Sequence, residues 1–252
     1  MSDQTTTLAA ATRAAPLGAY RRAVRLTAEA GVATAAMEDD VHHFEVVLRH
    51  EGDLVTSVEA RPVRTPWSAC PGAAQQLKTL EGCTTEQIRL MGAVERAEHC
   101  LHLYDLAILA ATHAGKPGFE RLYRIEVDYD ASPPLARLWR DGLEVLSWGL
   151  DGKRIRGSRY DGLAFADLAG HLARSDADES EIEAALILRR ASLISLVRPL
   201  DLDAFPGGRI SQTGLANCYA KRPGRRETSV RNMGTSRDLW GAGVWPLEGQ
   251  ST

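Results

Sequence analysis

The chain has 252 residues, a formal net charge of −3 and a hydrophobic fraction of 44%, values typical of an ordinary globular protein. This length allows one large domain or two small ones, and the near-neutral charge gives no reason to expect nucleic acid as a partner. No apolar run approaches the roughly 18–20 residues of a membrane helix, and the N-terminus lacks the pattern of an export signal. We therefore expect a cytoplasmic protein without membrane contact, in which the four cysteines are thiols or metal ligands.

The N-terminal half predicts a run of strands followed by a run of helices. Residues 1–16 are polar and small, and we expect a disordered tail there. Alternation of apolar and polar residues, clearest in 42–50, predicts an antiparallel meander of short strands. The expected strands are 20–28, 32–37, 42–50 and 54–63. The period then changes to that of helices, which we expect at 73–80, 86–97 and about 100–114.

The C-terminal half predicts a second group of strands and one long helix. Alternation predicts strands at 119–130, 135–140 and 144–150, with a hairpin turn at Asp141-Gly142. A capping box at Ser180–Glu183 opens a helix that runs to about Val197. The tail, 201–252, lacks periodicity, and we expect a loop there with one short strand near Cys218 and Tyr219.

The fold class that these elements predict is α+β, in two regions. Residues 17–116 form the first region, an antiparallel β-meander followed by helices. Residues 117–252 form the second region, β-rich with the long helix, and we expect it to pack on the first.

Most of the side chains that can bind a metal lie between residues 39 and 105. They are Asp39, Asp40, His42, His43, His50, Cys70, Cys83, His99, Cys100, His102 and Asp105. Zinc and iron are held by three or four such ligands, and a catalytic zinc keeps one position open. No single spacing here is a strong metal signature. On a continuous helix Cys100 and His102 point roughly 160–200° apart, so both can face one metal only if Cys100 precedes the first helical turn.

The order of these features resembles the iron–sulfur scaffold fold of the IscU, SufU and NifU N-terminal family. The resemblance rests on the run 38–55, on the Cys-Pro-Gly-Ala phrase at 70–73 and on the pair His99-Cys100. It implies a meander followed by helices, with Asp40, Cys70 and His99-Cys100 on the family site. Glu38 stands where the first family cysteine is expected, which leaves a metal site but puts cluster assembly in doubt.

A second resemblance covers more of the chain. The phrase Asp39–Phe44, the Cys-Pro-Gly-Ala phrase, the Cys-x-His-Leu phrase at 100–103, Leu188–Ala191 and Cys218-Tyr219 resemble an uncharacterised bacterial family of domains of unknown function. This resemblance implies no reaction. It favours His102 over His99 as the helix ligand, whereas the scaffold fold favours His99.

Our leading hypothesis is a metal-dependent enzyme, a hydrolase or lyase, that acts on a small organic substrate. Asp40, Cys70, Cys100 and His102 would hold a divalent metal, zinc or iron, while His42 and Asp105 would move protons. The alternatives are a depleted iron–sulfur or sulfur-transfer scaffold, a metal-free Cys/His thiol enzyme, and a non-catalytic binding protein held together by zinc. A homodimer is the default expectation for a protein of this size.

Overall fold

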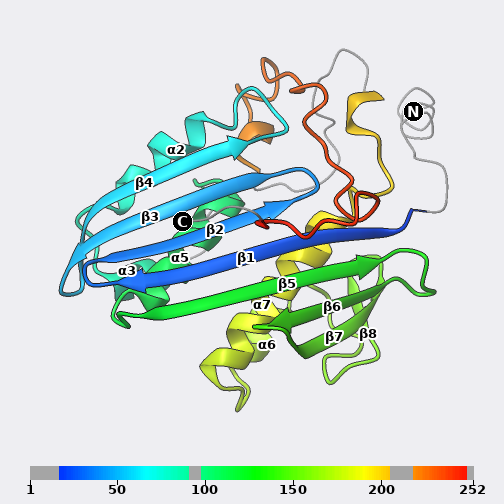
Figure 1. Ribbon diagram of the computed structural model, residues 1–252, viewed down its shortest axis with the longest axis horizontal. Coiled ribbons are helices and arrows are strands. Elements are labelled where there is room, and N and C mark those ends of the chain that lie inside the picture. Colours follow the sequence, from blue (N-terminus) through cyan, green and yellow to red (C-terminus); the bar gives the residue numbers. More distant parts are fainter. Residues whose placement is uncertain (1–16, 91–97, 205–217, 249–252) are drawn as a thin grey trace. The chain divides into compact units, whose positions relative to one another are not determined.

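The structure is a computed structural model, and it describes residues 17–90, 98–204 and 218–248 (Figure 1). The expected disordered tail at 1–16 and the last part of the helix expected at 86–97 lie outside the described residues. Within the described ranges, no helix is long and apolar enough to cross a membrane.

One antiparallel sheet of eight strands is the centre of the architecture, and its strands follow the order β4-β3-β2-β1-β5-β6-β7-β8 (Figure 1). The strands are β1 Ala19–Glu29, β2 Val32–Asp39, β3 His43–Glu51, β4 Leu54–Arg64, β5 Phe119–Asp128, β6 Leu135–Arg140, β7 Leu143–Asp151 and β8 Arg154–Arg156. Each strand pairs with the next one in sequence, except that β5 pairs with β1 and not with β4. Pro62, which cannot donate a backbone hydrogen bond, lies in the edge strand β4 beside a register shift.

Helices pack on the strands that precede them in the chain. The helical elements are α2 Gly72–Leu77, η1 Lys78–Leu80, α3 Thr85–Leu90, α5 Leu101–His113, α6 Leu168–Leu172, α7 Glu179–Ser195, η2 Leu202–Ala204 and η4 Tyr219–Lys221. Helix α5 contacts β2 and β3, α2 contacts β4, and α7 contacts β6 and β7 (Figure 1).

The sequence predicts an α+β protein, and the structure is α+β, but the expected division into a scaffold-like half and a separate second half is wrong. The first four strands do not form a sheet of their own, because β1 also pairs with β5 and so joins them to the last four strands. The likeness to the IscU and SufU fold therefore has no support. The short strand expected near Cys218 and Tyr219 is also wrong, since η4 is a 3-10 helix.

Two compact units share this sheet, and each is made of segments far apart in sequence. Among the described residues, the first unit comprises Val24–Arg121 and Leu202–Arg237, and the second comprises residues 17–23, Leu122–Asp201 and 238–248. The division falls inside β1 and inside β5, so both strands contribute residues to both units.

The core of the first unit follows directly from the alternation in the sequence. Phe44, Val46 and Leu48 of β3 are almost fully buried, as are Leu103 and Leu106 of α5. Because α5 contacts β3, these side chains form the layer between helix and sheet. Full burial of a side chain of this size contributes about 1.5–3 kcal/mol each, which fixes the position of α5 relative to the β2–β3 hairpin.

Residues 218–237, which we call the strap, contain no strand of the sheet. Their arginines bind several parts of the first unit together. Arg222 donates hydrogen bonds to the carbonyl oxygens of Glu98 and His99, just before α5. Arg231 is buried and donates to the carbonyl oxygen of Pro66 at the end of β4. Arg237 donates its backbone N–H to Asp40. The strap thus connects the start of α5 with the turn between β2 and β3.

In the second unit, buried polar groups fix α7 against the sheet. The side chain of Asp178 accepts the N–H of Glu181 and caps the helix, where the sequence predicts a capping box beginning at Ser180. Trp148 of β7 is fully buried and donates its indole N–H to Ser192 of α7. Such bonds keep buried donors satisfied and set the register of helix on sheet.

Candidate functional site

The turn that joins β2 to β3 carries two of the candidate ligands. The N–H of Asp39 donates to the carbonyl of His42, which closes the hairpin directly after the pair Glu38 and His43. The Asp39 carboxylate folds back onto the turn, and its Oδ1 accepts the backbone N–H groups of Val41 (2.8 Å) and His42 (2.7 Å). This side-chain capping is the reason why Asp is favoured in tight turns. Asp39 is fully buried as a result.

The same carboxylate oxygen also orients an imidazole. Asp39 Oδ1 lies 3.2 Å from Nδ1 of His42, whose side chain is 13% exposed. A carboxylate on one ring nitrogen fixes the orientation of a histidine ring. His42 is therefore held as a ligand or base with a defined direction.

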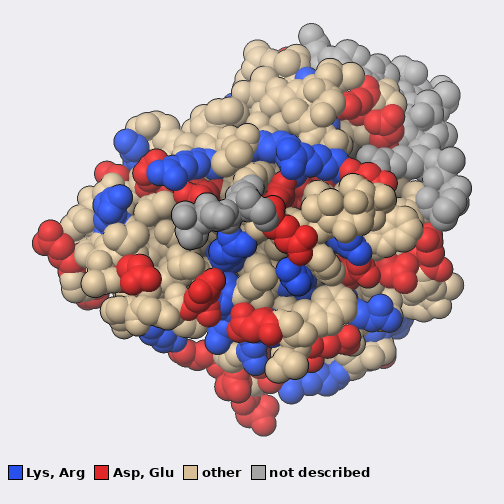
Figure 2. All heavy atoms as spheres, in the orientation of Figure 1, with Lys and Arg blue, Asp and Glu red and all other residues tan. Residues whose placement is uncertain are grey.

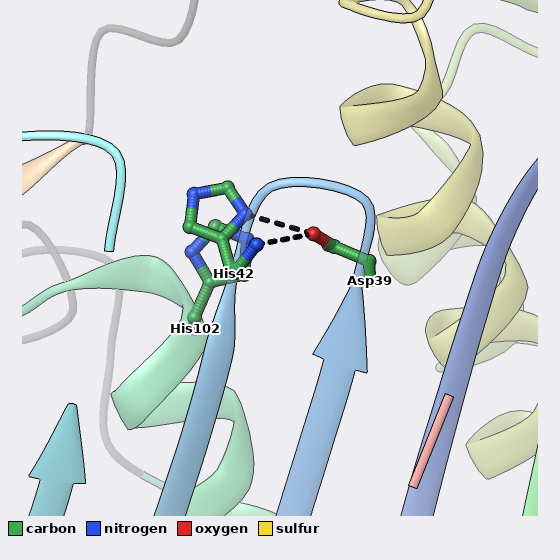
Figure 3. A group of neighbouring side chains, drawn as sticks. All are labelled: Asp39, His42 and His102. Atoms are coloured by element: carbon green, nitrogen blue, oxygen red, sulfur yellow. Dashed lines mark hydrogen bonds and ion pairs between the residues drawn. The ribbon is translucent and has the colours of Figure 1, made fainter. Parts of the chain in front are cut away.

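His102, from the first turn of α5, completes the group. Its ring lies against the ring of His42, with centroids 4.2 Å apart and an angle of 34° between the planes. One ligand atom each from Asp39, His42 and His102 can be chosen so that all three lie within 4.8 Å of one another. Figure 3 shows the two rings overlapping beside the turn, with the Asp39 carboxylate facing His42. In the described part of the chain, this is the one group of three such residues that meets that distance.

Arg64, at the end of β4, binds the backbone of the turn. Its guanidinium donates to the carbonyl oxygens of Asp39, Asp40 and His42, and to the carboxylate of Glu38. The side chains of Arg64 and Glu38 are only 9% and 5% exposed, so this is a buried ion pair. The planar fork of arginine suits several acceptors at once, and it fixes the backbone that carries Asp39 and His42.

Phe44 covers the group with buried surface, while its neighbour His43 is also buried. Phe44 stacks on the rings of both His42 and His102, each at 5.7 Å between centroids. Burial lowers the pKa of His43 below its usual value, although the nearby Glu38 carboxylate acts in the opposite direction. His43 is therefore a neutral imidazole at neutral pH.

The other predicted site residues lie apart from this group. Asp40 is buried in the same turn, where its backbone carbonyl accepts from Arg64 and from the N–H of Arg237. Asp105 is half-buried on α5, three residues after His102 and so on the same side of the helix. His99, the alternative ligand, stacks on Tyr104 at 4.9 Å, and burial lowers its pKa.

The predicted cysteine ligands form a second cluster. Cys70 lies in the loop before α2, and Cys100 is the N-cap residue of α5, in an extended conformation before the first helical turn. Cys70 packs with Trp67, Ala220 and Cys218. Burial raises the pKa of Cys70, and the nearby Cys218 and Cys100 raise it further. Burial raises the pKa of Cys100 to about 11, while backbone N–H groups of the first helical turn act against this.

Sequence reasoning missed three residues that the structure brings to these clusters. It chose Asp40 over Asp39, although the spacing from Asp39 to His42 is that of a side-chain-capped turn. It did not include Cys218 among the expected ligands, and it gave Arg64 no role. Cys218 and Arg64 carry no local signal, because their partners are far away in the sequence.

Comparisons with known proteins agree with the second resemblance in part, over residues 21–116, and give no support to the first. Residues 21–116 match a family described as "Protein of unknown function (DUF2889)". The matched stretch includes the β2–β3 turn and the Cys-Pro-Gly-Ala and Cys-x-His-Leu phrases, and it covers less than half of the chain. A search of curated proteins found no match. The part of the chain that carries Asp39, His42 and His102 is thus similar to a family of unknown function, which assigns it no reaction.

Proposed function

We propose that the protein is a metal-dependent enzyme, with zinc or iron, of hydrolase or lyase type, that acts on a small organic substrate. The observation that carries this proposal is the approach of Asp39, His42 and His102, whose ligand atoms lie within 4.8 Å of one another. Two histidines and one carboxylate are a donor set of catalytic zinc and of non-haem iron sites.

The chemistry of this donor set fits an enzyme better than a structural site. Three protein ligands leave a coordination position for substrate or water, and a metal there polarises a carbonyl or lowers the pKa of bound water to about 7. The donor set differs from the one that we expect from the sequence, because Asp39 replaces Asp40 and His42 becomes a ligand. Asp105, one helical turn from His102, keeps its proposed role in proton transfer.

The rigid structure around the three side chains also supports the proposal. Arg64 fixes the backbone of the turn, and the packing of α5 on β3 fixes His102. The stacked Phe44 ring gives the site an apolar wall. A site of this kind binds its metal without a large change in the fold, which favours catalysis over a role in folding alone.

The thiol-enzyme alternative has less support. A nucleophilic cysteine needs a lowered pKa, whereas burial raises the pKa of both Cys70 and Cys100. These thiols are therefore protonated at neutral pH, and neither is activated by a histidine in the manner of a catalytic pair.

We further propose a cytoplasmic protein with a small-molecule substrate and without nucleic acid or membrane partners. A homodimer is the default for a protein of this size. All four cysteines are free thiols, which fits a reducing compartment.

The test is the metal content of protein purified without chelators, measured by elemental analysis for wild type and three variants. We expect His42→Ala and His102→Ala each to lose one equivalent of zinc or iron per chain. His50→Ala is the matched control, since His50 lies at the opposite end of β3 and contacts the carbonyl of Gly52. Equal metal content in all four proteins would refute the proposed site. If the two histidine variants lose the metal as expected, the next step is a screen of hydrolase and lyase substrates.

A further inference from the structure

The strap contacts both of the elements that carry the three candidate ligands. Asp39 and His42 belong to the turn between β2 and β3, and His102 is the second residue of α5 (Figure 3). The C-terminal end of the strap contacts the turn, and its N-terminal part contacts the chain just before α5. The two ligand-bearing elements are thus joined by a segment that supplies no ligand itself.

Arg222 of the strap holds the entry to α5. Its guanidinium donates to the carbonyl oxygens of Glu98 (2.7 Å) and His99 (3.1 Å), and its side chain is only 15% exposed. The N-cap residue is Cys100, whose thiol is a weak acceptor and makes no capping hydrogen bond in the described part of the chain. Arg222 therefore takes the place of a side-chain cap, since it fixes the peptide units that lead into the first turn.

The direction of the His102 side chain depends on this entry. Leu103 and Leu106 are buried where α5 contacts the sheet, which fixes the axis of the helix. The ends of helices fray, however, when their terminal peptide groups are not held. Because His102 lies in the first turn, the backbone there determines whether its ring stays against that of His42, with centroids 4.2 Å apart.

The C-terminal end of the strap holds the turn that carries the other two ligands. The backbone N–H of Arg237 donates to the carbonyl oxygen of Asp40 at 2.7 Å. Arg64 donates to the carbonyl oxygen of Thr235 in the strap and to that of Asp39 in the turn. The guanidinium of Arg64 therefore binds the strap and the turn to each other.

The part of the strap between these contacts is itself anchored. Arg231 is buried and donates to the carbonyl oxygen of Pro66 and to the hydroxyl groups of Thr235 and Ser236. The backbone N–H of Asn232 also donates to Pro66, at 2.9 Å. A segment that is fixed along its length keeps its two ends at a constant separation, and with them the start of α5 and the turn.

We propose that Arg222 is a positioning residue for metal binding by Asp39, His42 and His102, and that docking of the strap is coupled to binding of the metal. This role rests on the proposed function and extends it from the ligands to the segment that aligns them. Residues that hold metal ligands contribute about 10–100-fold to affinity, and we expect an effect in that range. The coupling is reciprocal, so the bound metal should stabilise the docked strap by the same factor.

The first experiment is a titration of metal-free protein with Co²⁺, followed by visible absorption. Wild type is compared with Arg222→Ala, with Arg222→Lys and with the matched control Arg226→Ala. Arg226 lies in the same strap, but in the described part of the chain it pairs with its sequence neighbour Glu227. Asp and Glu side chains are exposed on the face shown in Figure 2 and bind Co²⁺ weakly, so His42→Ala measures this background.

We expect the Co²⁺ dissociation constant to be about 10–100-fold higher in Arg222→Ala than in wild type, and unchanged in Arg226→Ala. Arg222→Lys keeps donors for the carbonyl groups and should restore part of the affinity. Equal affinity in wild type and Arg222→Ala would overturn the positioning role and leave the proposed function intact. No binding above the His42→Ala background in wild type would overturn both.

A second experiment uses the wild-type chain and so does not depend on the folding of an Arg222 variant. Hydrogen exchange is measured by mass spectrometry with and without Zn²⁺. We expect Zn²⁺ to slow exchange in strap peptides that contain Asn232 and Arg237, whose N–H groups are bonded to Pro66 and Asp40. Helix α7 of the second unit is the internal reference for a general change in stability. If the strap is not slowed relative to α7, docking and metal binding are not coupled.

Discussion

Replacing Arg64 tests whether the turn that carries Asp39 and His42 depends on one guanidinium. Arg64 donates five hydrogen bonds: three to carbonyl oxygens of the turn, one to the carbonyl of Thr235 and one to Glu38. In Arg64→Met each carbonyl loses one donor, although those of Asp40 and His42 keep a backbone N–H, and the buried Glu38 carboxylate loses an ion-pair partner. Breaking such a pair costs about 3–5 kcal/mol. Because Arg237 still donates to Glu38 at 3.1 Å, we expect the lower end, about 3 kcal/mol.

The assay is urea unfolding followed by tryptophan fluorescence, with Arg61→Met as the matched control. Arg61 lies three residues earlier on β4 and also makes two ion pairs, but its side chain is 53% exposed. Exposed pairs contribute about 0–1 kcal/mol, so Arg61→Met should be nearly neutral. Arg64→Lys keeps the charge but not the planar fork, and we expect it to fall between the two. If Arg64→Met and Arg61→Met lose the same stability, the clamp has no energetic role.

Three further outcomes follow from burial. Burial raises the pKa of Tyr129 from 10 to about 12, so the contribution of the neutral phenol to stability is present below pH 10 and is lost as the pH rises towards 12. Urea unfolding at each pH should show that wild type loses about 1–2 kcal/mol more than Tyr129→Phe over this range. Trp148→Phe should cost about 2 kcal/mol because it opens a cavity and removes a buried hydrogen bond, while the half-buried Trp139→Phe should cost much less, as thermal unfolding will show. In native protein, mass spectrometry should find Cys83 alkylated well before Cys70, and the reverse order would contradict the buried cluster.

The individual strands could be predicted from the sequence because alternation is a local property. Residues 42–50 alternate clearly, and the structure has β3 at His43–Glu51. The continuity of the sheet could not be predicted in this way. It depends on the pairing of β1 with β5, two strands about 90 residues apart, and such a pairing leaves no periodic signal in either strand.

The candidate site could be predicted in its region but not in its grouping. The stretch from Asp39 to Asp105 does contain the three-residue group, yet of the expected ligands only His102 belongs to it, and Cys70 packs in a separate apolar cluster. Two physical reasons explain this. Asp39, not Asp40, folds onto its own turn, because a carboxylate can cap the backbone two and three residues ahead. Cys100 and His102 sit two positions apart at the start of α5, where the backbone changes from extended to helical and sends neighbouring side chains in different directions.

The strap also sets a time for the assembly of the site during synthesis. The contact of Arg237 with Glu38 spans 199 residues, and that of Arg231 with Pro66 spans 165. At roughly 5–20 residues per second, a ribosome makes Arg237 about 10–40 s after Glu38. The β2–β3 hairpin can form early, but for that interval its buried carboxylate lacks one of its two arginines. The turn with Asp39 and His42 therefore reaches its final state only after Arg237 has been translated.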